Sequence, residues 1–107
     1  MATLLAPNLP VAKSEWGLEA WHSPETLYRG QIDRLVFDGQ EWWLLDYKTA
    51  RPATGVDWED FIASKVEKYR PQLLAYREMA AKFFEVTPPE IINLVLFFTA
   101  SRRHVRL

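Results

Sequence analysis

The sequence contains no cysteine and only two histidines, His22 and His104. The missing thiols exclude disulfides, iron–sulfur clusters and cysteine-ligated zinc, so the residue types present favour a divalent cation held by oxygen atoms. Neither sign of charge is in large excess, because 13 Lys and Arg residues stand against 14 Asp and Glu residues. The formal net charge is -1, so no global positive field attracts nucleic acid. Any such contact depends on a local patch.

Long apolar runs are also missing. No stretch approaches the roughly 18 residues of a membrane span. The short run at residues 4–6 lacks a basic flank and is bounded by Pro7 and Pro10, unlike a signal peptide. We therefore expect a cytoplasmic protein with no membrane partner. With 49% hydrophobic and 25% charged residues, the 107-residue chain is typical of a single folded domain over residues 1–107.

Alternating apolar and polar residues predict three strands in the first half of the chain, at about residues 11–21, 27–37 and 41–49. Trp16 and Leu18 should face the core from the first of these strands. β-Branched and aromatic residues dominate the other two, as strands prefer.

The second half of the chain predicts helices followed by strands. A short helix should begin after Asp57, followed by a break or kink at Pro71 and a longer helix over about residues 70–84. The apolar run that starts at Ile91 predicts one or two further strands. This order indicates an α/β fold in which helices flank a mixed β-sheet.

A charged cluster is predicted beside the best hairpin turn, Asp38-Gly39. A two-residue turn there makes Asp33 and Asp46 diagonal neighbours on one face, roughly 7 to 8 Å apart at the backbone. Lys48 lies on the same face, two residues after Asp46. The preceding residues are apolar, and an isolated charge in a buried strand costs several kcal/mol unless it is paired or binds an ion. Two carboxylates and one ammonium in such a place are the layout expected for metal-assisted hydrolysis.

Three ordered motifs carry a family resemblance. They are GQIDRLV at residues 30–36, LDYKT at residues 45–49 and YRPQLLAY at residues 69–76. These motifs closely resemble the G-x-I-D-R, D-Y-K-T and Y-x-x-Q-L-x-x-Y signatures of RecB/AddA-type nucleases in the PD-(D/E)XK superfamily. The resemblance implies a restriction-endonuclease-like core and points to the C-terminal nuclease core of a protein like the exonuclease V beta subunit.

The resemblance also implies roles for individual residues. Asp33 and Asp46 match the metal-binding acids, the backbone carbonyl of Tyr47 matches a further ligand, and Lys48 matches the catalytic lysine. Glu15 falls near the position of another active-site acid in related domains. Glu19 is the alternative, and a solvent-facing acid of an alternating strand explains Glu15 equally well.

Two residues of the third motif match the Q-x-x-x-Y pair of the family. Gln72 and Tyr76 are one helical turn apart, and the family pair lies beside the active site, where it orders the site or contacts DNA. The polar edge and the core edge of an ordinary helix are the other explanation for these two side chains.

The chain departs from the family in one respect. Members of the RecB and AddA group have an upstream helix with a histidine that completes the metal shell, and nothing before Glu15 resembles it. His22 and His104 fall at other places. We therefore expect a truncated or fragment form of the domain that lacks its N-terminal helix, and the sheet edge left open favours a homo-oligomer.

The function implied by the resemblance is a DNA nuclease that depends on Mg²⁺ or Mn²⁺ and has no iron–sulfur cluster. It should act as an exonuclease in DNA end processing and recombinational repair, together with a helicase domain or helicase–nuclease subunits. The alternative is a catalytically incomplete nuclease-like domain that binds DNA or serves in assembly.

Two basic clusters could supply the local attraction for phosphate, although solvated surface explains them equally well. They are Lys65, Lys68 and Arg70 on the predicted helix, and Arg102, Arg103 and Arg106 near the end of the sequence. Most of the five tryptophans belong to the core by their size, while an exposed Trp21 or Trp58 could stack on a base.

Overall fold

The computed structural model describes residues 10–24 and 26–107, except for the side chains of residues 20–23 and 26–28. The apolar run at residues 4–6 and the side chains of Trp21 and His22 therefore lie outside the described residues. In the described part of the chain, one sheet has the strand order β1-β2-β3-β4-β5. The strands are β1 (Val11–Ser23), β2 (Thr26–Phe37), β3 (Trp42–Lys48), β4 (Ile92–Phe98) and β5 (Arg103–Arg106). β3 and β4 are parallel and the other neighbours are antiparallel, which confirms the predicted mixed sheet.

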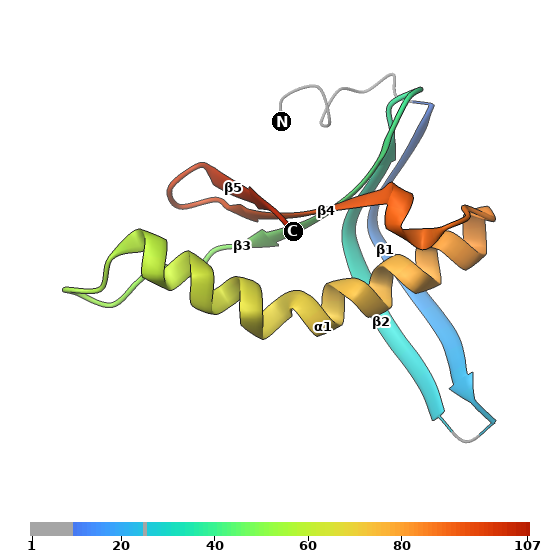
Figure 1. Ribbon diagram of the computed structural model, residues 1–107, viewed down its shortest axis with the longest axis horizontal. Helices are drawn as coiled ribbons and strands as arrows, with labels where there is room; N and C mark the ends of the chain where they lie inside the picture. The colour runs from blue at the N-terminus through green and yellow to red at the C-terminus, as the bar shows by residue number, and fades with distance from the viewer. Residues whose placement is uncertain (1–9, 25) are drawn as a thin grey trace.

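One long helix, α1 (Trp58–Phe84), connects β3 to β4 through the short 3-10 helix η2 (Pro89–Ile91). Figure 1 shows α1 lying across one face of the sheet, with the turn end of the β1–β2 hairpin extending past it. The main core lies between this helix and the sheet. Its fully buried members include Leu35, Leu44, Leu73 and Phe98, and Trp16 and Leu18 pack against it as predicted.

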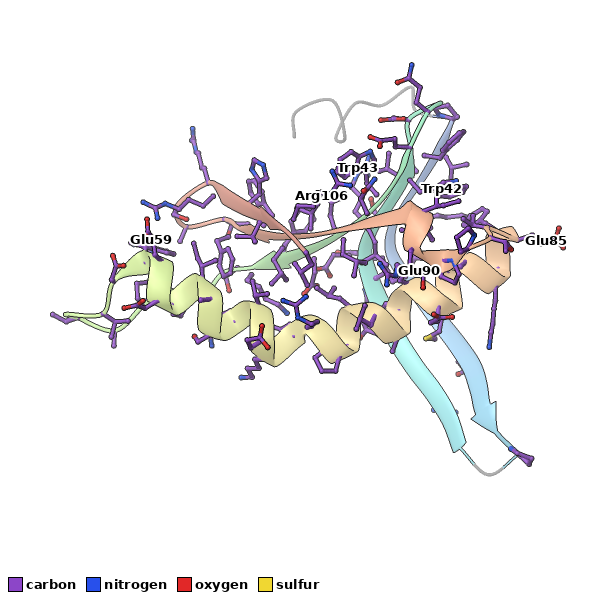
Figure 2. All side chains as sticks on the ribbon, viewed as in Figure 1. Trp42, Trp43, Glu59, Glu85, Glu90 and Arg106 are labelled. Carbon is purple, nitrogen blue, oxygen red and sulfur yellow. The ribbon has the colours of Figure 1, made fainter. Side chains whose placement is uncertain are left out.

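A smaller apolar cluster lies on the opposite face of the sheet. Val36, Leu45 and Val95 are buried there and pack against Trp43 and Tyr47. Figure 2 shows Trp43 and Arg106 on this side, away from α1. Because β3 and β4 carry buried side chains on both faces, their sequences read as continuous apolar runs rather than as alternating patterns.

Of the break or kink predicted at Pro71, the break is wrong, because α1 continues through this residue. Proline removes one backbone donor and crowds the carbonyl four residues earlier, at Glu67. Pro71 and Glu67 are exposed, whereas Val66 and Leu73 on either side are buried against the sheet. The packing of these flanking turns holds one helix together across the defect, and water can solvate the freed carbonyl. Asp57 occupies the predicted N-cap position, but its side chain makes no capping hydrogen bond.

The hairpin between β2 and β3 has a four-residue loop, residues 38–41, where the sequence predicted a two-residue turn. The backbone amides of Gln40 and Glu41 donate to Oδ1 of Asp38 at 2.9 and 2.8 Å. The four-residue loop is favoured over a two-residue turn, because one carboxylate accepts hydrogen bonds from two backbone amides. The register moves by two residues and pairs Leu35 with Leu44. An even shift preserves the face of every side chain.

None of the described helices is both long and apolar enough to cross a membrane.

Candidate active site

The β2–β3 ladder changes character where the charged residues begin. Its regular pairs run from Phe37–Trp42 to Arg34–Leu45 and stop there. Beyond this pair, the backbone amide of Tyr47 donates to a side chain instead of to the backbone of β2. Its acceptor is Oδ2 of Asp33, at 2.8 Å. A hydrogen bond of this length to a carboxylate is strong, so Asp33 is fixed against β3.

The backbone of β2 is irregular at the same place. Ile32 and Leu35 both reach the core beneath α1, although residues three apart in a regular strand point to opposite faces. On the other side of β2, the pairs with β1 pass from Ser14–Arg34 to Trp16–Ile32 and skip the residues between them. The skipped residue of β1, Glu15, has a φ of 49°, a conformation that is uncommon for a residue with a side chain. Both ladders therefore loosen around Asp33.

Asp46 is the most buried charge of the site. It lies in β3, between β2 and β4, and is 7% exposed. Its Oδ2 is 2.8 Å from Nζ of Lys48, whose side chain is 20% exposed. Burial and the hydrogen-bonding neighbour Asp33 raise the pKa of Asp46 from 3.8 to about 6, against the opposing effect of Lys48. The two carboxyl groups and the ammonium thus lie close together, as the sequence predicted.

The carboxylate oxygens of the site are ligands of the kind that a divalent cation prefers. Oδ2 of Asp46 is buried and has no aligned hydrogen-bond donor, since the lysine approaches it as an ion pair only. An adjacent second carboxylate and an unsatisfied anionic oxygen fit Mg²⁺ or Mn²⁺, which are bound by one or two carboxylates and otherwise keep water. Among the described residues no group of three or more His, Asp or Glu side chains could hold a metal. The described residues therefore offer two carboxylates toward such an ion.

Gln72 and Tyr76 meet on α1, as their spacing predicted. Nε2 of Gln72 donates to the hydroxyl of Tyr76 at 2.7 Å. The ring of Tyr76 lies against Gly30 of β2, and a Cβ atom added at Gly30 would be 2.2 Å from Cε1 of that ring. The glycine in the first motif thus allows the tyrosine of the third motif to reach the sheet, three residues before Asp33.

Glu15 and Glu19 are not brought into the charged cluster. The side chain of Glu15 is exposed, and in the described part of the chain it makes no hydrogen bond or ion pair with Asp33 or Asp46. By register Glu15 lies opposite Asp33 across the skipped position of the β1–β2 ladder. Glu19 pairs with Arg29 at 3.2 Å on the exposed hairpin. Of the two acids, only Glu15 is adjacent to the site.

The side chain of Tyr47 points away from the cluster. It packs on the opposite face, edge-on to Phe97 with ring centroids 6.0 Å apart. Burial raises the pKa of its hydroxyl. Tyr47 therefore meets the site only through its backbone, whose amide binds Asp33.

Tyr69 lies beside Lys48, and the sequence had not indicated a role for it in the site. Nζ of Lys48 lies 3.7 Å from the ring centroid of Tyr69 in α1. Tyr69 begins the third motif, so its helical spacing from Gln72 and Tyr76 was the available signal. Its contact with β3 depends on how α1 crosses the sheet, which spacing within a helix cannot reveal.

Several cations of the two basic clusters rest on aromatic rings or acids. Lys65 lies over Phe61 and Lys68 over Tyr69, and Arg70 pairs with Glu67. Arg103 lies over Trp58, and Arg106 lies over Trp43 and donates to Asn93. His104 and Arg102 are exposed. Trp58 packs against the main core, so it is less open for stacking than the sequence allowed.

The sheet, the crossover helix and the acid–lysine cluster are consistent with a restriction-endonuclease-like α/β fold. A scan against protein families matches residues 10–105 to the PD-(D/E)XK nuclease superfamily. The chain therefore belongs to this superfamily, whose members are generally nucleases, typically use divalent metal ions and act on DNA. A search of curated proteins found no match for the chain.

Proposed function

We propose that this chain is a metal-dependent deoxyribonuclease of the RecB/AddA type, which cleaves DNA ends as an exonuclease alongside helicase domains or subunits. The observation that carries this proposal is the buried Asp46, which has a second carboxylate and a lysine beside it and no aligned donor on Oδ2. A structural ion pair gains nothing from a second acid, because Asp33 disfavours the charged form of Asp46. A divalent cation uses both carboxylates, because its charge balances theirs.

In this proposal Asp33 and Asp46 hold a Mg²⁺ or Mn²⁺ ion, with the Tyr47 carbonyl as a further ligand. The bound ion supplies Lewis acidity that activates water and polarises a phosphate oxygen. Lys48 donates hydrogen bonds to the phosphate oxygens and stabilises the negative charge that develops as water attacks phosphorus. The attacking water gives a proton to solvent as its oxygen bonds to phosphorus, the bond from phosphorus to the leaving oxygen breaks, and that oxygen takes a proton from solvent.

The remaining residues support this arrangement. The Gln72–Tyr76 hydrogen bond and the contact of Tyr76 with Gly30 favour a role in fixing α1 beside the site. Glu15 is proposed as an additional acid because it lies opposite Asp33 in the register, at a point where the backbone is irregular. Lys68, Arg70 and Arg103 are proposed to attract the DNA backbone, in place of a global positive charge.

The proposal is tested by cleavage of labelled single- and double-stranded linear DNA. We expect cleavage in Mg²⁺ and in Mn²⁺, and none with EDTA or with Lys48→Ala. Lys82→Ala is the matched control, since it removes an exposed lysine in the last turn of α1 that belongs to neither basic cluster. Cleavage by Lys48→Ala at the rate of the wild type would contradict the assignment.

A catalytically incomplete nuclease-like domain that binds DNA is the second candidate. It is favoured by one observation, namely that the described residues offer no group of three His, Asp or Glu ligands. Calorimetric titration with Mn²⁺ separates the two candidates. A competent site binds Mn²⁺ and loses that binding in Asp33→Asn and in Asp46→Asn. An incomplete domain binds DNA, but its weak affinity for Mn²⁺ is the same in the wild type, Asp33→Asn and Asp46→Asn.

A further inference from the structure

Lys48 is held by two different groups on two different elements. On its own strand, Oδ2 of Asp46 lies 2.8 Å from Nζ. From α1, the ring of Tyr69 presents its centroid 3.7 Å from the same atom. This is well inside the range of about 6 Å over which an ammonium is attracted to the face of an aromatic ring. The lysine is therefore restrained both by a charge and by a π-system.

The ring of Tyr69 is itself well fixed. It is half-buried and packs against the main core, on the stripe of α1 that also carries Val66 and Leu73. The four-carbon side chain of a lysine is flexible, so a single ion pair leaves its ammonium free to pivot. A rigid ring as a second contact removes that freedom and selects one position of Nζ.

The contact depends on the ring face rather than on the hydroxyl. Two ammonium groups approach the same ring, since Nζ of Lys68 lies 5.3 Å from its centroid. Within the described residues, the Tyr69 hydroxyl makes no hydrogen bond that would give it a separate role. Phenylalanine should therefore replace Tyr69 without loss.

The ring of Tyr69 matters most when a cation is bound at Asp46. A cation bound by Asp46 shares the charge of that carboxylate, and the attraction between Asp46 and Lys48 then weakens. The ring of Tyr69 carries no net charge to share, so it remains as the contact that directs Lys48. A lysine that keeps its position costs less reorganisation when charge develops on the phosphate.

We propose that Tyr69 is a positioning residue, which uses its ring face to hold the ammonium of Lys48 for transition-state stabilisation. The catalytic part of this inference rests on the proposed nuclease function. The geometric part concerns residues of the metal-free protein and can be tested without any activity.

The first test is an NMR measurement of the Lys48 side chain in the metal-free protein. Protons beside the face of an aromatic ring are shifted upfield, so the Lys48 ε-protons should be upfield in the wild type and in Tyr69→Phe. They should return to ordinary values in Tyr69→Leu. Lys68→Gln removes the other ammonium from the ring and should leave the Lys48 signal in place. An unchanged signal in Tyr69→Leu would overturn the proposal.

The second test measures kcat and KM for DNA cleavage. We expect Tyr69→Phe to match the wild type. Tyr69→Leu should lose about tenfold in kcat with KM unchanged, which is the size expected for loss of a partly buried cation–π contact. Pentafluorophenylalanine at position 69 keeps the shape of the ring but reverses the electrostatics of its face. It should therefore lose activity like leucine, even if leucine perturbs the packing. Phe61→Leu is the matched control, because it removes a ring of α1 that faces Lys65.

The outcomes separate the two proposals. Wild-type kcat in both Tyr69→Leu and the fluorinated variant would overturn the positioning role. An inactive wild type whose Lys48 signal still depends on Tyr69 would overturn the proposed function and the catalytic part of this inference, and would leave the contact established.

Discussion

The two ends of the β2–β3 ladder use the same strands for opposite purposes. At the loop end, Leu35 pairs with Leu44, and both are fully buried in the core beneath α1. At the other end the ladder stops, and Asp33 and Asp46 bring a second carboxylate against a buried one. Leu44 and Asp46 are only two residues apart on the same face of β3. Burial of the apolar Leu44 side chain stabilises the fold, whereas burial of the charged Asp46 side chain does not.

The largest effect expected from this contrast is on catalysis at the charged end. Asp46→Asn removes a proposed metal ligand but keeps the size and shape of the side chain. We expect the rate of DNA cleavage to fall by about a thousandfold or more, as when a group that stabilises the transition state is lost. The variant should remain folded by circular dichroism. A folded Asp46→Asn protein with wild-type cleavage would show that the charged end has no catalytic role.

The largest effect on stability is expected at the apolar end. Leu44→Ala leaves a cavity in the core beneath α1 and should lower the free energy of unfolding by about 2–5 kcal/mol, measured by urea denaturation. Under conditions where the variant is folded, its cleavage rate should match the wild type. A selective loss of activity without loss of stability would mean that the two ends of the ladder are not separate.

A smaller effect is expected where α1 meets β2. Gly30→Ala places a Cβ atom against the ring of Tyr76, and overpacking of this kind costs about 1–3 kcal/mol. Gly17→Ala is the matched control on β1, because a Cβ atom there has no neighbour within 4 Å. Thermal unfolding of the two variants should therefore separate clearly. Equal stabilities would show that Tyr76 moves aside easily.

The last effect, no larger than that of Gly30→Ala, is a dependence of stability on pH. The pKa of Asp46 is about 6 in the folded chain and near 3.8 when unfolded, so the folded state binds the proton more tightly. The stability from this proton is complete below about pH 3.8 and is lost as the pH rises through about 6.

The comparison with Asp46→Asn isolates this contribution from the other acids. In EDTA, the wild type should lose about 1–3 kcal/mol relative to Asp46→Asn between pH 4 and pH 7. Urea denaturation across this range measures the difference. Parallel stability curves for the two proteins would mean that Asp46 is not perturbed by burial.

Much of the fold was accessible from the sequence, because alternation and apolar runs report burial directly. The first four strands fall within a few residues of their predicted positions, the fifth had been left open, and the grouping of Asp33, Asp46 and Lys48 survived an error in the turn. The even shift of the regular pairs kept Leu35 and Asp46 on one face, and the hydrogen bond from the Tyr47 amide holds Asp33 beside them where the ladder ends. An odd shift would have separated the two acids.

The errors have two sources, namely contacts between distant parts of the chain and a local choice of loop length at Asp38. Nothing local in the sequence shows that Val66 and Leu73 pack against the sheet firmly enough to carry the helix through Pro71. The hydrogen bonds from two amides to Asp38 likewise depended on a loop longer than the shortest one available. The contact of Lys48 with Tyr69 joins β3 to α1, and the crossing of two elements is a tertiary property.

The left-handed conformation of Glu15 has a consequence for the surface of the protein. Among the described residues β1 is an outer strand of the sheet, and the backbone groups on its outer side form a row that a second chain could join by hydrogen bonds. A residue at φ 49° cannot take part in a continuous flat row, and its exposed carboxylate adds repulsion between copies. The twist at Glu15 therefore divides this edge into two shorter segments, each a poorer template for aggregation than a thirteen-residue strand would be.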